Sequence, residues 1–570
     1  MGRGIALTYP GLVFDPKFHY IMKRETNPNK VTLISGGGSG HEPAHAGYIG
    51  KGMLDVAVCG DVFASPSQVQ IYRAIKASRS SRGTLLIIKN YSGDMMNFLG
   101  AAAMAKEDGI DVEYVKVDDD VAVQDSLYTV GRRGVAGTVL VHKVAGAQAE
   151  RGGSLLEVKA AAGEAIRNIR TMGFALSSCT VPAKGTPTFE IDDGEMELGV
   201  GIHGEPGIRR ERELCSDELA ERLVDSLLAE YDLSDGSAVT LMVNGLGSTP
   251  LMELYVFNAS VRRILDERGV EVYRSFTGNY MTSIDMLGAS VTLMKMTDHL
   301  RGLIDEPSSA PAFVVEGPSC SRSYDEVAGK PGSSTTRLAE KVNDPSSPTI
   351  EGKGLSLGNI LFMVKRMGDC IIENEVPFCE LDSHAGDGDF GMSLAKGFRQ
   401  LRCEWDGILV DDSSNIGKFL DACSMVIMEH CGGASGPIWG SAFRAAARSA
   451  GDASHLALGE FADLMQAAVK GVQAIGERSF GRGAVAGDKT LIDALAPCAN
   501  ELKLAASEGA EIREALVRGA EAAVAGAKST ESIVARMGRA GTVGKRSIGY
   551  PDAGAHALGV VFTDIAASME

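Results

Sequence analysis

The sequence contains few cysteines for its length, and the ten that are present are scattered. None of them belongs to a Cys-x-x-Cys pair. Paired or evenly spaced cysteines are typical of disulfide frameworks and of structural zinc sites. Their absence argues against a disulfide-stabilised secreted fold and favours a reducing compartment.

Membrane and targeting signals are also missing. No apolar run approaches the roughly 20 residues that a helix needs to span a bilayer. The first residues lack the charged and apolar regions of a secretory signal, and Ala6 stands where a myristoylation site has Ser or Thr. These absences predict a cytoplasmic protein with no membrane partner.

Basic residues are outnumbered, with 56 Lys and Arg against 74 Asp and Glu, for a net charge of -18. Nucleic-acid binding needs clustered Lys and Arg to neutralise phosphates, so nucleic acid is not expected as the main partner. With 44% hydrophobic and 23% charged residues the composition is globular. A chain of 570 residues exceeds the size of one hydrophobic core, which predicts more than one domain.

Two common nucleotide-binding signatures are absent. The stretch Ser35-Gly-Gly-Gly-Ser-Gly-His-Glu-Pro43 follows an apolar run and can bring backbone N–H groups close to a ligand. However, His41 and Pro43 stand where a Rossmann fingerprint requires glycine. No P-loop string occurs, and in Gly487-Asp-Lys-Thr490 Asp488 occupies the position of the P-loop lysine. Any nucleotide must be held by another device.

His41-Glu-Pro-Ala-His45 matches the His-Glu-x-x-His string of zinc proteases. That string binds zinc only when both histidines share one face of a helix. Four glycines immediately upstream and Pro43 between the histidines make such a helix unfavourable. We therefore interpret His41 as a polar group in a glycine-lined pocket.

The first three hundred residues alternate short apolar runs with amphipathic segments, which predicts an α/β domain with a partly parallel sheet. We assign it to residues 1–305, in two subdomains that divide near residue 174. Strands are predicted at residues 31–35, 54–58, 84–89, 111–117, 174–181, 196–202, 238–243, 270–273 and 289–294. Helices are predicted at residues 66–78, 94–108, 155–171, 217–231 and 251–268.

Strand patterns nearly vanish in the last third of the chain. Residues 306–353 are rich in Pro, Ser and Gly, which is typical of a linker. Residues 354–570 contain Ala-rich and Leu-rich segments with short connections, which predict an all-α domain. Its helices are predicted at residues 355–372, 393–402, 415–429, 440–450, 458–477, 490–502, 511–525 and 530–537.

The densest group of carboxylates is Asp382, Asp387 and Asp389, with glycines between them that predict a loop. Carboxylates ~5 Å apart repel by about 3 kcal/mol for each pair at an effective dielectric of 20, and a divalent cation removes that penalty. Mg²⁺ is commonly held by carboxylates together with substrate phosphate oxygens. A solvated acidic turn is the alternative, but the sequence predicts a metal site on the helical domain.

Three polar residues of the α/β half fall at predicted strand ends, where ligand sites collect in such folds. They are His41, Asp94 and His203, and they could meet in one pocket. The alternatives are that Asp94 caps a helix and that His203 is structural. In the helical half, residues 430–437 should open a helix whose N–H groups and Ser435 could receive phosphate oxygens.

Several long strings together resemble the single-chain, ATP-dependent dihydroxyacetone (glycerone) kinases. They are Ser-Gly-Gly-Gly-Ser-Gly-His-Glu-Pro-Ala-His-Ala-Gly, Ala-Val-Cys-Gly-Asp-Val-Phe-Ala-Ser-Pro, Gly-Ile-His-Gly-Glu-Pro-Gly, His-Ala-Gly-Asp-Gly-Asp and Gly-Gly-Ala-Ser-Gly-Pro. The resemblance spans residues 33–303 and 355–558. It implies an N-terminal substrate domain and a C-terminal nucleotide domain built as a barrel of eight helices.

The same resemblance implies roles for individual residues. His203 would hold the substrate carbonyl carbon covalently as a hemiaminal, Asp94 would take the proton of the attacking hydroxyl, and His41 would assist. The implied substrate contacts are Gly38, Ser39, Gly40 and Lys89. The implied nucleotide contacts are Phe390, Gly391, Met392, Ser393, Ala434, Ser435, Gly436, Thr490, Leu491, Arg539, Asp552, Ala553 and Gly554. Asp382, Asp387 and Asp389 would bind Mg²⁺, as two ions, with Mn²⁺ as a possible substitute.

The activity implied is phosphorylation of dihydroxyacetone, with glyceraldehyde as a further substrate, by ATP in a homodimer. Two alternatives stay open. Some members of the family split FAD to cyclic FMN at the same nucleotide site, and some relatives bind dihydroxyacetone as regulators without ATP. The intact aspartate cluster in the same chain argues against a regulator.

Overall fold

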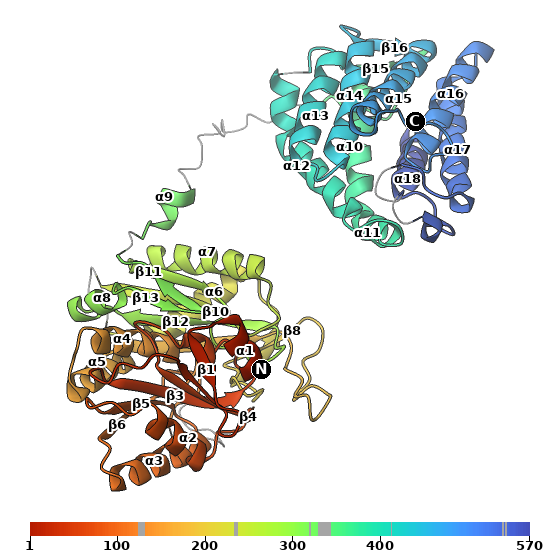
Figure 1. The fold of residues 1–570 in the computed structure, drawn as a ribbon. Coiled ribbons are helices and arrows are strands. Elements are labelled where there is room, and N and C mark those ends of the chain that lie inside the picture. The colour runs from red at the N-terminus through yellow and green to blue at the C-terminus, as the bar shows by residue number, and fades with distance from the viewer. Residues whose placement is uncertain are drawn as a thin grey trace. The chain divides into compact units, whose positions relative to one another are not determined.

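The computed structural model describes residues 1–123, 131–232, 237–318, 321–328, 344–411, 413–537, 541 and 544–570. The chain divides into two compact units, Met1–Ser334 and Thr335–Glu570 (Figure 1). Among the described residues, no helix combines the length and the apolar character that crossing a membrane requires.

The first unit contains two six-stranded sheets together with helices, which agrees with the predicted α/β class. In the first sheet the strand order is β1-β2-β4-β3-β5-β6, with β4, β3, β5 and β6 parallel and β1 and β2 antiparallel at one edge. Its strands are β1 (Leu12–Phe14), β2 (Tyr20–Lys23), β3 (Thr32–Ser39), β4 (Val56–Val62), β5 (Thr84–Lys89) and β6 (Val112–Val117). Its helices are α1 (Gly2–Thr8), α2 (Gln68–Ala77), α3 (Ser92–Glu107), α4 (Thr138–Glu150) and α5 (Leu155–Asn168).

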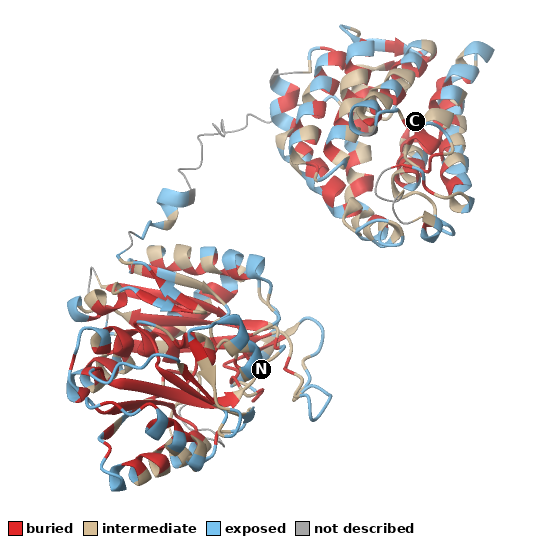
Figure 2. Cartoon of the chain, in the orientation of Figure 1, coloured by how far each residue is buried: buried red, intermediate tan, exposed pale blue. Residues whose placement is uncertain are grey.

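Both faces of the first sheet are buried. Along β5, Leu86 and Ile88 pack into a core with α2 and α3, whereas Leu85 and Ile87 pack into a core with α4 and α5. The alternation follows from the two-residue period of a strand. Figure 2 shows the resulting continuous burial of the central strands. A capping box between Ser154 and Glu157 begins α5.

The second sheet has the order β11-β10-β12-β7-β8-β9, and only β10 and β11 pair in parallel among its strands. Its strands are β7 (Ile169–Ala175), β8 (Glu195–Leu198), β9 (Arg209–Arg212), β10 (Ala238–Gly245), β11 (Glu271–Gly278) and β12 (Gly288–Lys295). One face is covered by α6 (Ser216–Leu228) and α7 (Leu251–Glu267). Met242 and Met294 on the other face join the core that contains α4, α5 and α8 (Asp298–Ile304).

Several predictions for the first unit need correction. The strands predicted at residues 174–181 and 196–202 end at Ala175 and Leu198. The glycine-rich stretch is not wholly a loop, because β3 continues to Ser39 and pairs with β4. Residues 169–171, predicted as helix, begin β7. The stretch predicted as a linker from residue 306 starts with a hairpin of β13 (Ser308–Ala310) and β14 (Phe313–Val315), whose Phe313 is buried in the core. Helix α9 (Tyr324–Ala328) follows.

The second unit is helical, as predicted, with one two-stranded sheet. Its elements are β15 (Gly354–Ser356), α10 (Leu357–Glu373), α11 (Glu375–Asp382), α12 (Phe390–Asp411), α13 (Ile416–His430), α14 (Ser435–Ala450), β16 (His455–Ala457), α15 (Leu458–Phe480), α16 (Ile492–Glu508), α17 (Ile512–Ser529) and α18 (Ala553–Ser568). Residues of α10 and α12 to α18 form one apolar core. The predicted helix at 530–537 is wrong, because only Thr530–Ser532 form a 3-10 turn. Helices α11 and α18 were not predicted.

Candidate functional site

His203 lies in the turn between β8 and β9, surrounded by aromatic rings from other segments of the first unit. Its ring centroid is 4.7 Å from that of His41, 4.4 Å from that of Tyr91 and 5.3 Å from that of Phe63, all with the ring planes nearly perpendicular. The His203 side chain keeps 17% of its surface exposed. The imidazole is therefore held by edge-to-face contacts and stays partly exposed.

A carboxylate lies beside this histidine and binds its main chain. The backbone N–H of His203 donates to Oε2 of Glu205 at 2.9 Å, and Nδ1 of His203 lies 3.5 Å from Oε1. Burial alone would raise the pKa of Glu205, but the hydrogen bond and charge of His203 and the Arg133 guanidinium outweigh burial and lower that pKa to about 2. Glu205 is thus an anion on the Nδ1 side of the ring.

Arg133 is itself buried and held by hydrogen bonds. It donates from Nε to Oδ2 of Asp120 at 2.7 Å and to the carbonyl of Gly199 at 2.7 Å. Burial raises the pKa of Asp120 to about 6 although the charge of Arg133 opposes the shift. The charge of Arg133 therefore acts on the carboxylates of both Asp120 and Glu205.

The tautomer of His41 follows from its partner. Nδ1 of His41 lies 2.9 Å from the carbonyl oxygen of Thr282, which can only accept, so Nδ1 carries the proton. Burial, together with the charges of His203 and Lys89, holds the pKa of His41 well below its ordinary value. Its Nε2 is buried without a hydrogen-bond partner among the described residues. This bare lone pair beside His203 can accept a hydrogen bond from a ligand hydroxyl.

Lys89 and Asp94 lie at the carboxyl end of β5. The ammonium of Lys89 is fully buried and donates to Oδ2 of Asp94 at 3.4 Å. Asp94 stands in the first turn of α3, and the N-cap of that helix is Tyr91. The alternative that Asp94 is a helix cap is therefore wrong.

The glycine-rich end of β3 lines the same region. Ser39 donates to the carbonyl of Gly60 at 2.8 Å. A Cβ at Gly38 would come 2.6 Å from the backbone of Phe63, and one at Gly40 would come 2.9 Å from its ring. Glycine at these positions lets the segment that carries Phe63 approach closely. The sequence reasoning named His41, Asp94, Lys89 and these glycines, which the fold brings together, but it missed the rings and charges around His203.

In the second unit the three predicted aspartates do converge. Asp382 is the last residue of α11, and Asp387 and Asp389 lie in the short loop before α12. Each offers one carboxylate oxygen, and the three oxygens lie within 4.8 Å of one another. The predicted loop is thus shorter than expected, since residues on both sides of it are helical, and the cluster lies between α11 and α12.

Two helix starts adjoin this cluster. Phe390, Gly391, Met392 and Ser393 form the first turn of α12, and Ala434 is the N-cap of α14, which begins with Ser435 and Gly436. The N–H of Gly432 donates to the carbonyl of Ser393 at 3.2 Å, which joins the two starts.

The remaining predicted nucleotide residues form a second group. Asp552 is the N-cap of α18 and is followed by Ala553 and Gly554. Leu491, next to Thr490, is the N-cap of α16. The two helix starts lie close together, since a Cβ at Gly554 would be 3.2 Å from Leu491. His384 stacks on Tyr550 with centroids 3.7 Å apart, which joins this group to the aspartate loop. Arg539, also predicted to contact nucleotide, lies outside the described residues.

Buried charges shape this second group. Burial raises the pKa of Asp552 to about 7, and the charges of Asp493 and Asp382 add to the shift. Lys489, absent from the predicted site, is buried and donates to the carbonyls of Thr530 at 2.8 Å and Tyr550 at 2.7 Å. Lys489 therefore holds the segment that leads to α18 in place.

Two family models match the chain, the Dak1 domain over residues 3–312 and the DAK2 domain over residues 384–567. Among relatives, the dihydroxyacetone-binding subunit DhaK of a PTS-dependent dihydroxyacetone kinase from Listeria innocua is 55% identical over 278 residues, which cover 49% of this chain and 84% of the subunit. Triokinase/FMN cyclase from Rattus norvegicus is 36% identical over 546 residues, covering 94% of this chain and 90% of the relative.

A solved structure has the same two-part organisation. The dihydroxyacetone kinase of C. freundii, in complex with AMP-PNP and Mg²⁺, is 31% identical and aligns with a TM-score of 0.57, covering 99% of this chain and 97% of that one. The matches extend over both units. With its Dak1 and Dak2 domains in one polypeptide, this chain belongs to the dihydroxyacetone kinase family.

Proposed function

We propose that the protein is an ATP-dependent kinase that phosphorylates dihydroxyacetone, and also glyceraldehyde, to the triose phosphate. The observation that carries the proposal is the setting of His203. An oriented imidazole with exposed surface lies beside His41, whose Nε2 has no partner among the described residues. Such an arrangement suits a small ligand that has both a carbonyl and hydroxyl groups.

The covalent step uses His203 as a nucleophile. With Nδ1 facing the Glu205 carboxylate, the ring proton resides on Nδ1 and the Nε2 lone pair is available. Nε2 forms a bond to the carbonyl carbon, and the π electrons of the C=O bond move to oxygen. That oxygen takes a proton from water, and the hydroxide so formed leaves to bulk solvent. The ring becomes an imidazolium whose charge Glu205 balances. Glycerol has no carbonyl and is excluded.

Phosphoryl transfer then uses a terminal hydroxyl of the captured triose. Asp94 accepts the proton of this hydroxyl while the hydroxyl oxygen attacks the γ-phosphorus of ATP, and ADP leaves. Lys89 holds the Asp94 carboxylate by the contact at 3.4 Å. His41, through Nε2, accepts a hydrogen bond from a substrate hydroxyl and fixes the orientation of the triose.

The aspartate cluster fits a divalent metal, because three carboxylate oxygens lie within 4.8 Å of one another. Such an oxygen-only set suits Mg²⁺, in two ions, and Mn²⁺ as a substitute. When bound by Asp382, Asp387 and Asp389, the metal neutralises charge on the ATP phosphates. The starts of α12 and α14, with Ser393 and Ser435, present backbone N–H groups to phosphate oxygens.

Turnover requires the triose site and the nucleotide site to meet. In the proposed arrangement they do so in a homodimer, where each helical unit serves the α/β unit of the partner. We place this activity in the cytoplasm.

The decisive experiment incubates wild type and His203→Ala with dihydroxyacetone, without a reducing agent. The intact mass of each protein then shows whether substrate has been captured. We expect an added triose mass in wild type and none in the variant, together with loss of kinase turnover and normal ATP binding. An unchanged kcat/KM in His203→Ala would refute the proposal.

A second candidate activity is the splitting of FAD to AMP and cyclic FMN, because the rat relative bears the name triokinase/FMN cyclase. This reaction needs the nucleotide site but not His203. We therefore expect His203→Ala to retain it in the presence of Mn²⁺. If no cyclic FMN appears with either metal in wild type, this second activity is excluded.

A further inference from the structure

Two buried histidines behind the proposed triose site touch each other. Nδ1 of His45 lies 3.0 Å from Nε2 of His142, and the ring centroids are 5.2 Å apart. His45 follows the glycine-rich stretch and His142 lies in the middle of α4, with exposed fractions of 5% and 0%. His45, the second histidine of the zinc-protease-like string, therefore pairs with a residue far along the chain.

The protons of Lys89 determine the direction of the hydrogen bonds. Its Nζ contacts the carbonyl oxygen of Gly36 at 3.3 Å, Oδ2 of Asp94 at 3.4 Å and Nε2 of His45 at 3.2 Å. An ammonium has three N–H donors and no acceptor. Each contact therefore takes one donor, and Nε2 of His45 must be an acceptor.

The tautomers of both histidines follow. Because Nε2 of His45 accepts, its proton is on Nδ1, which donates to Nε2 of His142. The proton of His142 is then on Nδ1, which has no hydrogen-bond partner among the described residues. Burial and then the charge of Lys89 hold the pKa of His45 well below its ordinary value and lower that of His142 to about 3. Both rings are neutral.

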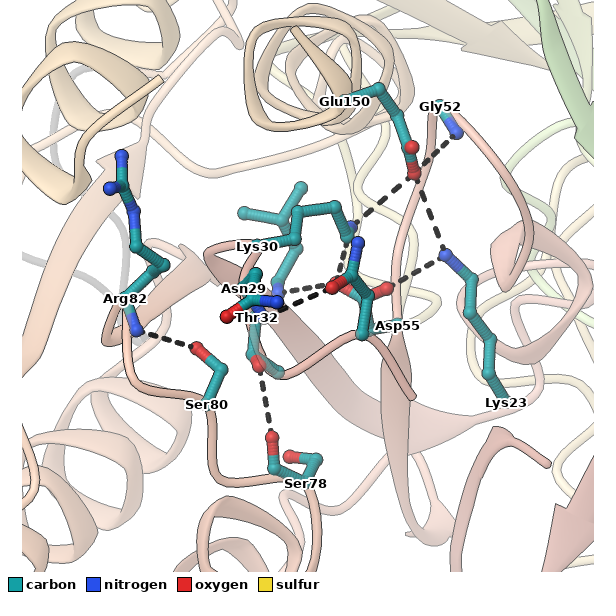
Figure 3. Close-up of polar contacts among 12 residues, drawn as sticks. Lys23, Asn29, Lys30, Thr32, Gly52, Asp55, Ser78, Ser80, Arg82 and Glu150 are labelled. Carbon is teal, nitrogen blue, oxygen red and sulfur yellow. Dashed lines mark hydrogen bonds and ion pairs between the residues drawn. The ribbon is translucent and has the colours of Figure 1, made fainter. Parts of the chain in front are cut away.

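Helix α4 is anchored independently at its carboxyl end. Glu150 contacts Nζ of Lys30 at 3.5 Å and accepts a hydrogen bond from the N–H of Gly52 at 3.3 Å (Figure 3). Asp55 in turn accepts from Lys23 at 2.7 Å and from Lys30 at 2.9 Å. These contacts fix the helix along its axis. His142, two turns earlier, is thereby held in register with His45.

We propose that His45 and His142 are positioning residues for the phosphoryl-transfer step. His142 accepts the Nδ1–H of His45 and so holds its ring in place, and His45 accepts the third N–H of Lys89. The remaining donors of Lys89 are directed at Gly36 and Asp94. The pair thus sets where the Asp94 carboxylate points when it receives the hydroxyl proton. This inference rests on the proposed kinase function and adds two residues to it.

Variants of His142 test the series of hydrogen bonds from Lys89 through His45 to His142. In His142→Phe the acceptor for His45 is lost, whereas in His142→Gln a side-chain oxygen near the position of Nε2 can still accept. Tyr48→Phe is the matched control, since Tyr48 is equally buried beside His142 but donates to the carbonyl of Tyr280 instead. We expect kcat to fall by about tenfold or more in His142→Phe and to stay within about threefold of wild type in His142→Gln and Tyr48→Phe.

Two further readouts separate positioning from general damage. Capture of dihydroxyacetone by His203, measured by intact mass, should be unchanged in His142→Phe, because only the transfer step is affected. Nitrogen-15 spectra of histidine-labelled wild type should show His45 and His142 as neutral rings protonated at Nδ1, a measurement that needs neither substrate nor variant.

The inference is overturned if either ring is protonated at Nε2, if His142→Phe keeps wild-type kcat, or if capture falls together with kcat. It is also overturned if His142→Gln is as slow as His142→Phe. Should wild type itself fail to capture dihydroxyacetone, the proposed function fails first, and the spectra still report whether the tautomers are as inferred.

Discussion

Nδ1 of His203 lies 3.5 Å from one carboxylate oxygen of Glu205, and the backbone N–H of the same histidine donates to the other oxygen at 2.9 Å. One acid therefore holds the main chain at the proposed nucleophile and places a carboxylate on the Nδ1 side of its ring. Glu205 was not singled out from the sequence, where it reads only as part of a turn. In the proposed mechanism this carboxylate favours the proton on Nδ1 and leaves Nε2 to attack.

Replacing Glu205 by Gln should weaken capture of dihydroxyacetone at least about tenfold, because an amide keeps the shape but loses the charge that balances the imidazolium. Equilibrium capture measured by intact mass across dihydroxyacetone concentrations checks this. Glu195→Gln is a matched control, since Glu195 lies in β8 close by and its carboxylate is 3.9 Å from the partly exposed Arg210. Equal capture by Glu205→Gln and wild type would contradict the assigned role.

The lowered pKa of Glu205 also predicts a pH dependence of stability. Its ordinary pKa is 4.5 and its folded value is about 2, so the unfolded chain binds the proton more readily. The stabilisation, up to about 3 kcal/mol for a shift of this size, is present above pH 4.5 and is lost as the pH falls toward 2. In urea unfolding, the free energy of unfolding of wild type should therefore exceed that of Glu205→Gln, and this difference should narrow between pH 6 and pH 3. A gap that widens on acidification would contradict this sign.

Local pattern was enough to predict most elements of the fold. The run at residues 84–89 is β5 to the residue, since its four central residues are Leu or Ile. Helix α4 was missed because nearly every residue from Thr138 to Glu150 is buried, which removes the polar face that marks an amphipathic helix. The alternation of strands and helices predicted the layers but not that α4 lies in the core between two sheets.

The candidate site could be predicted as a set of residues but not as a geometry. His41, Asp94 and His203 carry recognisable strings, and the aspartates cluster within eight positions of the sequence. By contrast, the contacts of His45 with His142 and of Lys489 with Tyr550 join residues 97 and 61 positions apart. No local period reports such pairs, because they are determined by tertiary packing.

Gly37 offers a test of how closely the strand must approach Lys89. Its φ of +153° disfavours a side chain, and a Cβ there would come 2.3 Å from Nζ of Lys89. We expect Gly37→Ala to displace the ammonium and lower kcat by about tenfold or more, in addition to a stability loss of about 1 kcal/mol. Gly109→Ala is the control, with a φ of +71° and open space around the new methyl group. It should lose similar stability while keeping its kcat, and equal kcat in both variants would contradict the prediction.

The aspartate cluster can be tested without kinase turnover. Asp387→Asn removes one negative charge with little change of shape, so Mn²⁺ binding followed by electron paramagnetic resonance should weaken about 10- to 100-fold. Asp463→Asn is the control, because Asp463 is an exposed acid of the same unit paired with Lys503. Chelation with EDTA should abolish both turnover of dihydroxyacetone and any production of cyclic FMN, since both depend on the same site. If Asp387→Asn binds Mn²⁺ as tightly as Asp463→Asn does, the three carboxylates are a solvated acidic turn and the metal must be held elsewhere.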